Sequence, residues 1–362
     1  MGLMFNMNKM IIFTDRQTDR QTDRQTDRQT DRRNNCINLF RLIAALQVAY
    51  GHMTAHLDID MPYLMDIIFG YFQGVPIFFL LSGFLVWDSI DRSKNYPTYL
   101  KKRFWRIYPE LWMGVVIELI IIATIYGIDN VKQFILFAFT QSTILQFWTP
   151  EFLRGYGCGT PNGALWTIGV FIQFYIIIWF IKKHLHDKDL LIWSIALGTS
   201  IVLGMIPHVL EGYAPEIILK CYEQTIFNYL YLFLIGSFLA EKRLQLLPFI
   251  KKYWYIVSAF AVIIYITGID VPWTSYAVIK GLLCGYGLIG FAYAFPQLNI
   301  KTDVSYGLYI YHMTVVNIMI TFGFTGKVIY MVIALVVSIV LAWMSTKTIG
   351  QWTVKRKNDQ LV

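Results

Sequence analysis

Long apolar runs recur along the whole chain, and they restrict its fold more than any other feature. Each run is long enough to cross the roughly 30 Å hydrocarbon core of a bilayer as a helix. Hydrophobic residues make up 56% of the 362 residues and charged residues only 15%, whereas an ordinary soluble domain has about 25% charged residues. Because lipid offers no partner for unpaired backbone groups, the sequence predicts an all-α, polytopic integral membrane protein.

About ten transmembrane helices are predicted from these runs. They lie at 38–56, 70–88, 109–127, 164–181, 189–206, 225–240, 253–269, 276–295, 304–322 and 328–346. A further apolar stretch at 131–148 is interpreted as a helix on the outer side or a re-entrant helix. If it were a span, Lys182, Lys183 and Lys188 would fall outside, against the positive-inside rule. An arrangement with eleven spans is the alternative.

The distribution of positive charge predicts the orientation. The net charge is +8, and with ten spans both termini and the basic clusters face the cytosol. These clusters are KKRFWR (101–106), KKHLHDK (182–188), EKRLQLLPFIKK (241–252) and VKRK (354–357). The outside loops keep only Lys132, Arg154, Lys220 and Lys327. No basic stretch alternates with exposed aromatic residues, so no nucleic-acid partner is expected.

Three regions are expected along the chain. Residues 1–35 contain a Thr-Asp-Arg-Gln repeat over 14–33, whose polar, charge-balanced composition predicts a disordered cytosolic tail. A membrane domain follows at 36–348, and a short basic cytosolic tail at 349–362. In the gene, the codons ACA-GAC-AGA-CAG would be repeats of the tetranucleotide ACAG. Gain or loss of one unit would shift the reading frame, so phase-variable expression is expected.

Ionisable groups inside the predicted spans are the candidates for chemistry, because they are costly to bury in lipid. Arg41 and His52 lie on one face of the first span, about 20° apart around the helix and roughly 16 Å apart along it. Arg41 is then near the cytosolic boundary, where snorkelling to lipid phosphates is the alternative. His52 is in the outer half, where a bond to a carbonyl is the alternative. Glu118 is the obvious mid-span carboxylate, with helix packing as its alternative role.

The first cytosolic loop carries a second group of candidates. Arg103 and Arg106 are three residues apart, so they share a helix face and suit the binding of a phosphate. An ordinary positive-inside cluster is the alternative. Before this loop, Ser82 and Gly83 permit close helix packing.

The cysteines predict no metal or redox centre, because Cys36, Cys158, Cys221 and Cys284 form no CxxC pair. Cys158 and Cys221 are both expected outside, where a disulfide is chemically possible and two free thiols are the alternative.

Five motifs follow one another in order. They are FRLIAALQVAYGH (40–52), FFLLSGFLV (78–86), RFWRIYP (103–109), NGALWTIGVFIQFYI (162–176) and SYGLYIYH (305–312). Through these motifs, which cover about residues 36 to 346, the chain resembles the acyltransferase-3 family of membrane-bound O-acyltransferases that modify bacterial surface sugars. Larger members of that family append a soluble esterase-like domain, and this chain is expected to be the membrane module alone.

The resemblance implies an enzyme of the bacterial inner membrane. Its donor would be cytosolic acyl-coenzyme A, usually acetyl-coenzyme A, and its acceptor a hydroxyl of a cell-envelope glycan such as lipopolysaccharide on the outer side. No permanently bound cofactor and no metal are implied. Arg41, Arg103 and Arg106 would bind the donor phosphates, and His52 would be the general base. Acceptor or positioning roles are considered for Ser82, Glu118, Trp166, Gln173, Tyr175, Ser305 and His312.

One position departs from the family pattern. Phe171 stands where family members commonly carry a glutamate, and Glu118 is the candidate to replace that acid. Two other functions therefore stay open. The chain could be a transporter or flippase for a lipid-linked sugar, or a catalytically silent relative of the family.

Overall fold

The computed structural model describes residues 34–267, 278–350 and 352–353, and all regular structure in them is helical. The all-α prediction is therefore confirmed for this part of the chain. The repeat at 14–33 and most of the basic tail expected at 349–362 lie outside the described residues.

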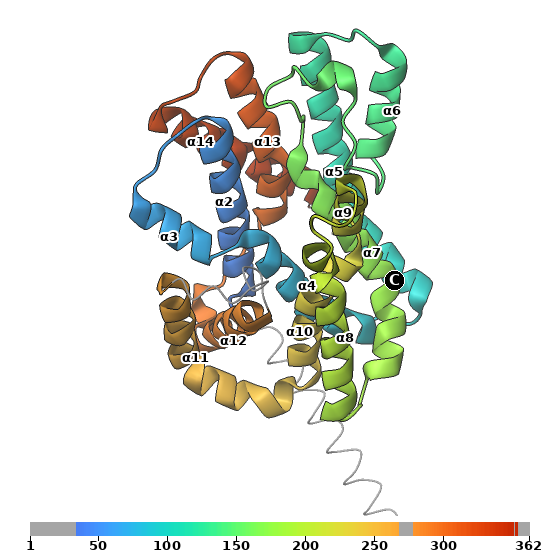
Figure 1. Cartoon of the computed structure of the whole chain (residues 1–362), viewed down its shortest axis with the longest axis vertical. Helices are drawn as coiled ribbons and strands as arrows, with labels where there is room; N and C mark the ends of the chain where they lie inside the picture. The colour runs from blue at the N-terminus through green and yellow to red at the C-terminus, as the bar shows by residue number, and fades with distance from the viewer. Residues whose placement is uncertain (1–33, 268–277, 351, 354–362) are drawn as a thin grey trace, which may run out of the picture.

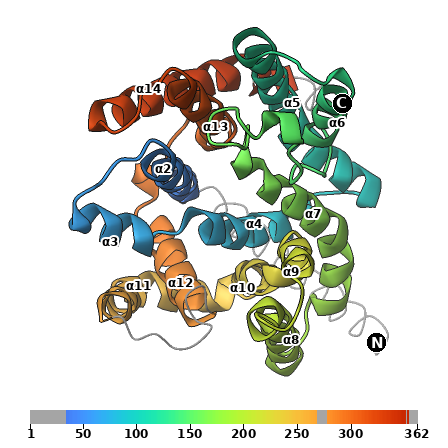
Figure 2. The same ribbon diagram turned by 45° about the horizontal axis from the view of Figure 1, so that its top comes forward.

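Long helices form the body of the molecule (Figure 1). They are α2 (Ile37–His56), α4 (Gly74–Asp91), α5 (Tyr96–Ile121), α7 (Trp166–Leu185), α8 (Leu190–Val209), α11 (Arg243–Ile266), α12 (Val278–Ala294), α13 (Ser305–Thr321) and α14 (Val328–Ser345). Shorter helices are α3 (Tyr63–Tyr71), α6 (Val131–Gln141), α9 (Glu216–Glu223) and α10 (Leu230–Glu241). Figure 2 shows α4 near the middle of the bundle, where it packs against α2, α7, α10 and α12.

Each of the ten predicted spans overlaps one of these helices, but the count of about ten spans is not confirmed. Among the residues that the structure describes, six segments are long and apolar enough to cross a membrane. They are Tyr63–Asp91, Tyr96–Tyr126, Gly163–Leu185, Leu190–Val209, Arg243–Ile266 and Val328–Gly350. Two others fall short of the roughly 20 residues that a spanning helix needs, since α10 has 12 residues and α13 has 17. For α12, the structure describes 17 residues, from Val278 onward. The remaining helix, α2, interrupts its apolar residues with Arg41, Gln47 and His52.

The stretch at 131–148 contains the helix α6, which has 11 residues. Such a helix rises about 17 Å, which is too short to cross the hydrocarbon core. This length favours the interpretation of 131–148 as a helix that does not span the membrane.

Two glycines allow α4 and α10 to pack closely. A β-carbon placed on Gly83 would lie 2.0 Å from the carbonyl oxygen of Phe233, and one on Gly236 would lie 2.0 Å from the carbonyl oxygen of Leu80. A side chain at either position would force the two helices apart. The predicted packing role is therefore confirmed for Gly83.

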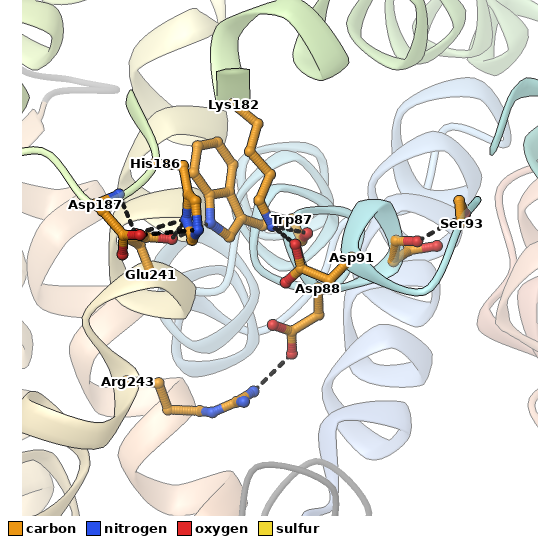
Figure 3. Close-up of polar contacts among 10 residues, drawn as sticks. Trp87, Asp88, Asp91, Ser93, Lys182, His186, Asp187, Glu241 and Arg243 are labelled. Atoms are coloured by element: carbon orange, nitrogen blue, oxygen red, sulfur yellow. Dashed lines mark hydrogen bonds and ion pairs between the residues drawn. The ribbon is translucent and has the colours of Figure 1, made fainter. Parts of the chain in front are cut away.

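Ion pairs join the ends of several helices at one end of the bundle (Figure 3). The ammonium group of Lys182, near the end of α7, lies 2.5 Å from Oδ1 of Asp91 on α4. At the start of α11, Arg243 lies 2.6 Å from Oδ2 of Asp88. Both cations are almost fully buried, so the carboxylates of α4 compensate charges that would otherwise be costly there.

The same end holds the connection between α7 and α8. Glu241, the last residue of α10, accepts a hydrogen bond from the backbone nitrogen of Asp187 at 2.9 Å and lies 3.0 Å from Nδ1 of His186. The two basic clusters that begin at Lys182 and Glu241 therefore lie next to each other, on the same side of the bundle (Figure 3). We call this side the charged end.

Candidate functional site

One carboxylate connects three helices. Asp303, two residues before α13, accepts hydrogen bonds at Oδ2 from Arg41 of α2 and from Arg106 of α5, the latter at 3.3 Å. Its other oxygen accepts from the backbone nitrogen and the hydroxyl of Ser305, at 3.1 and 2.5 Å. Asp303 thus fixes the start of α13 against the two arginines.

The electrostatics of this contact favour a charged Asp303. Burial alone would raise the pKa of its carboxyl group, but Arg41 and Arg106 lower that pKa below its ordinary value. The side chain of Arg41 is 17% exposed, whereas that of Arg106 is 53% exposed. A guanidinium has five N–H donors, so Arg106 can contact Asp303 and a solvent-borne anion together.

A cleft opens beside this ion pair. Its empty volume is about 580 Å³, and its walls include Arg41, Ser82, Arg106, Phe171 and Tyr175. The structure therefore brings together four of the residues that the sequence singled out, together with the unusual Phe171. A neighbouring hollow of about 490 Å³ shares Arg106 with this cleft.

Arg103 has different surroundings from Arg106. Its guanidinium donates to the hydroxyl of Ser89 at 2.7 Å and lies over the rings of Tyr99 and Tyr175, 5.8 and 5.7 Å from their centroids. Arg103 does not line the cleft itself, but it packs behind Tyr175, which does. The two arginines therefore contact different partners despite their helical spacing.

Two histidines form a hydrogen-bonded pair between α2 and α13. Nδ1 of His52 lies 2.8 Å from Nε2 of His312, and Nδ1 of His312 lies 3.0 Å from the carbonyl oxygen of Leu308. The carbonyl can only accept, so it favours a proton on Nδ1 of His312. A neutral His312 then accepts at Nε2, His52 donates from Nδ1, and Nε2 of His52 keeps a lone pair. This arrangement prepares His52 to accept a proton.

The cleft ends close to the histidine pair. Tyr309 lines the cleft, and its ring centroid lies 6.0 Å from that of His312. Its hydroxyl donates to the carbonyl oxygen of Ala164 at 2.7 Å, which fixes the ring between the cleft and His312. One aromatic ring thus lies between a cleft that begins at two arginines and His312, the hydrogen-bond partner of His52.

Other predicted residues take structural positions. Gln173 donates to the carbonyl oxygen of Gln224 at 2.9 Å and accepts from the backbone nitrogen of Ile226 at 3.3 Å, so it holds the segment before α10. Trp166 packs on Tyr229, with ring centroids 5.6 Å apart, outside the cleft.

Glu118 and Phe171 occupy different places. Glu118 is buried, with 1% of its surface exposed, and is not among the residues that line the cleft. Phe171 lines the cleft and packs on Phe79. Cys158 and Cys221 are free thiols, so the possible disulfide between them is not formed.

Sequence reasoning missed Asp303. The available signal was weak: an acidic residue just before a predicted span, two positions ahead of Ser305. Its partners, Arg41 and Arg106, lie about 200 or more positions earlier, and no helical periodicity connects residues so far apart.

Comparisons with known proteins give a consistent result. The family model described as "Acyltransferase domain" matches residues 34–347. Nodulation protein 10 of Rhizobium leguminosarum bv. viciae is 29% identical over 363 residues, which cover 90% of this chain and 95% of that protein. The O-acetyl transferase of Shigella phage Sf6 is 24% identical, over 91% of this chain and 98% of its own length.

The peptidoglycan O-acetyltransferase OatA of Listeria monocytogenes is 27% identical over 166 residues, which cover 41% of this chain and 26% of that protein. No solved structure matches the chain.

Replacing Asp303 should separate its ion pair with the two arginines from its hydrogen bonds at the start of α13. Asp303→Asn keeps an oxygen for Ser305 but removes the charge beside Arg41 and Arg106. We expect the free energy of unfolding to fall by about 2 kcal/mol, less than for a fully buried ion pair because the site is partly exposed. Asp303→Ala should cost ~1 kcal/mol more, since the contact at the start of α13 is also lost. Unfolding of the purified protein in detergent measures both.

The exposed Asp60 provides the control, since Asp60→Asn should leave stability unchanged. In the wild type, the contribution of Asp303 should be complete above its unfolded-state pKa of about 3.9. It should disappear as the pH falls through the lower folded-state pKa. Equal stability of Asp303→Asn and wild type at neutral pH would contradict this role.

Proposed function

Because this chain belongs to the acyltransferase-3 family and is a membrane O-acyltransferase, we propose that it transfers an acyl group, most simply acetyl, from acyl-coenzyme A to a cell-envelope glycan. The donor would enter from the cytosol, and the acceptor hydroxyl would lie on the outer side of the bacterial inner membrane. Both termini would be cytosolic. The observation that carries the proposal is the cleft that leads from Arg41 and Arg106 toward the histidine pair.

The arginines at the mouth of the cleft support an anionic donor. Coenzyme A carries phosphates, and guanidinium groups bind phosphates through paired hydrogen bonds. Arg106 is the more exposed of the two arginines that contact Asp303, so it is the first that an incoming phosphate would meet. Arg41 and His52 are roughly 16 Å apart along α2, a gap that the extended pantetheine arm would cross.

The histidine pair supports base catalysis. In the proposed step, Nε2 of His52 accepts the proton of the acceptor hydroxyl as its oxygen attacks the thioester carbonyl carbon. The new C–O bond forms, the C–S bond breaks, and the coenzyme A thiolate leaves and takes up the proton that His52 accepted, which returns His52 to its neutral form. His312 stabilises the protonated His52 by accepting the hydrogen bond from Nδ1. The reaction as written needs no cofactor besides the acyl donor.

The relatives support a glycan acceptor. One is named an O-acetyl transferase and another a peptidoglycan O-acetyltransferase. A lipopolysaccharide or another envelope polysaccharide would present hydroxyl groups to the outer side in the same way.

Substitutions should separate base catalysis by His52 from donor binding by Arg106. His52→Ala removes the base, and we expect kcat for acyl transfer to fall by ~10²–10⁴-fold. Arg106→Ala removes a phosphate contact, and we expect the KM for acetyl-coenzyme A to rise while kcat changes little, because the donor is held less tightly before the reaction. Transfer of radiolabelled acetyl groups to isolated envelope glycan measures both constants.

His56 is the matched control for the base. It lies one turn beyond His52 on α2 and is exposed, so His56→Ala should transfer at the wild-type rate. Lys101 is the matched control for Arg106, so Lys101→Ala should leave the KM for acetyl-coenzyme A at the wild-type value. Wild-type transfer by His52→Ala would refute the base assignment, and no transfer by the wild type would favour a silent relative or a transporter.

Phase variation is the remaining part of the proposal. The Thr-Asp-Arg-Gln repeat at 14–33 would be encoded by a uniform ACAG tract, whose slippage would switch the enzyme on and off. Sequencing the tract in sibling colonies should show copy numbers that differ by single units and match the presence or absence of glycan acylation. Mixed synonymous codons within the tract would exclude slippage.

A further inference from the structure

A large groove lies away from the cleft, between α4, α7, α8, α9 and α10. Its empty volume is about 2150 Å³. It lies at the start of α7 and α10 and at the end of α8, whereas the charged end contains the opposite ends of these helices. Because the charged end would face the cytosol under the positive-inside rule, the groove would open on the outer side.

The groove combines aromatic and polar side chains. Trp166 and Tyr229 supply aromatic surfaces, while Glu223 and Asn228 supply hydrogen-bonding groups. Aromatic rings pack against the C–H faces of sugars, and carboxylates and amides bond to sugar hydroxyls. A site for a lipid chain would need a uniformly apolar wall, so this combination favours a carbohydrate.

The charge of the groove restricts which carbohydrate it suits. Glu211, Glu216 and Glu223 line it, against the ammonium group of Lys220 and the imidazole of His208, which lies 3.7 Å from Glu211. Lys220 is already paired with Glu216 at 2.6 Å. The remaining carboxylates would repel phosphates and uronic acids.

We propose that this groove binds the acceptor glycan and selects an uncharged segment of it. This inference rests on the proposed function, because it assigns the acceptor site of that reaction. It also gives Trp166 a role in acceptor binding, away from the donor cleft.

The position of the groove suits transfer between the two sites. The ring of Phe79 lies 4.7 Å from that of Tyr229, which lines the groove, and 4.6 Å from that of Phe171, which lines the cleft. A single buried ring therefore stands between the two hollows at this point. An acidic side chain in place of Phe171 would make this wall polar, whereas in this chain it is entirely aromatic.

A second contact leads from the groove toward the base. Val75 lines the groove and packs against the cluster that contains Val48 and Tyr309. Val48 lies one turn before His52 on α2, and residues four apart share a helix face. The groove thus reaches the same layer of the protein as the histidine pair.

Binding without any donor tests the proposal. The full-length protein in nanodiscs would be applied to an array of uncharged, uronate-containing and phosphate-containing bacterial glycans. We expect binding to uncharged glycans alone. Titration calorimetry with the tightest of these should show at least tenfold weaker binding for Trp166→Ala and Glu223→Gln, and Trp166→Phe should restore much of it because the aromatic face returns.

Two exposed residues outside the groove serve as matched controls. Tyr213 is 89% exposed and Glu151 lies in a different loop, so Tyr213→Ala and Glu151→Gln should bind as the wild type does. Four results would each overturn the proposal. They are no glycan binding, binding to anionic glycans, displacement of glycan by bilayer lipid, or unchanged binding in both groove variants. Glycan binding by a wild type that transfers nothing would instead overturn the proposed function and leave the groove assignment intact.

Discussion

The ion pair between Asp303 and the arginines at 41 and 106 sets the arrangement on which the site depends. Its carboxylate fixes the start of α13 against α2 and α5. Farther along α2, and near the middle of α13, His52 and His312 meet at 2.8 Å. Two contacts, the ion pair of Arg41 with Asp303 and the hydrogen bond of His52 with His312, therefore hold α2 and α13 in register. We call this line of contact between the two helices the seam, and the cleft lies beside it. A shift of either helix by one turn would break both contacts together.

Because the contact between α2 and α13 needs polar side chains, α2 is poorly suited to face lipid. Arg41, Gln47 and His52 interrupt α2, and it packs against α4, α12, α13 and α14 instead of facing the bilayer broadly. Apolar helices such as α8 and α14 instead expose large hydrophobic side chains. The ionisable side chains thus lie on an interior helix, and the peripheral helices present apolar side chains to the membrane, as expected when ionisable groups are costly in lipid.

Much of this was predictable from local spacing. The eleven-residue interval between Arg41 and His52 correctly places both along the seam, and Gly83 behaves as a packing residue. Local spacing fails where partners come from distant segments. It gave no reason to pair His52 with His312, and it treated Arg103 and Arg106 as equivalent, although Arg103 lies over two tyrosine rings and Arg106 contacts Asp303. Hydropathy located the helices but not the number that cross the membrane, because α10 and α13 are short.

Transfer across a sealed membrane tests the central claim, that donor and acceptor reach the site from opposite sides. Proteoliposomes would enclose the envelope glycan, and an impermeant thiol reagent would report orientation through the exposed Cys221 near the groove. With Cys221 inside, acetyl-coenzyme A added outside should acetylate the enclosed glycan. With Cys221 outside, it should not, even when glycan is supplied on the same side. Transfer with donor and glycan both on the Cys221 side would contradict the account.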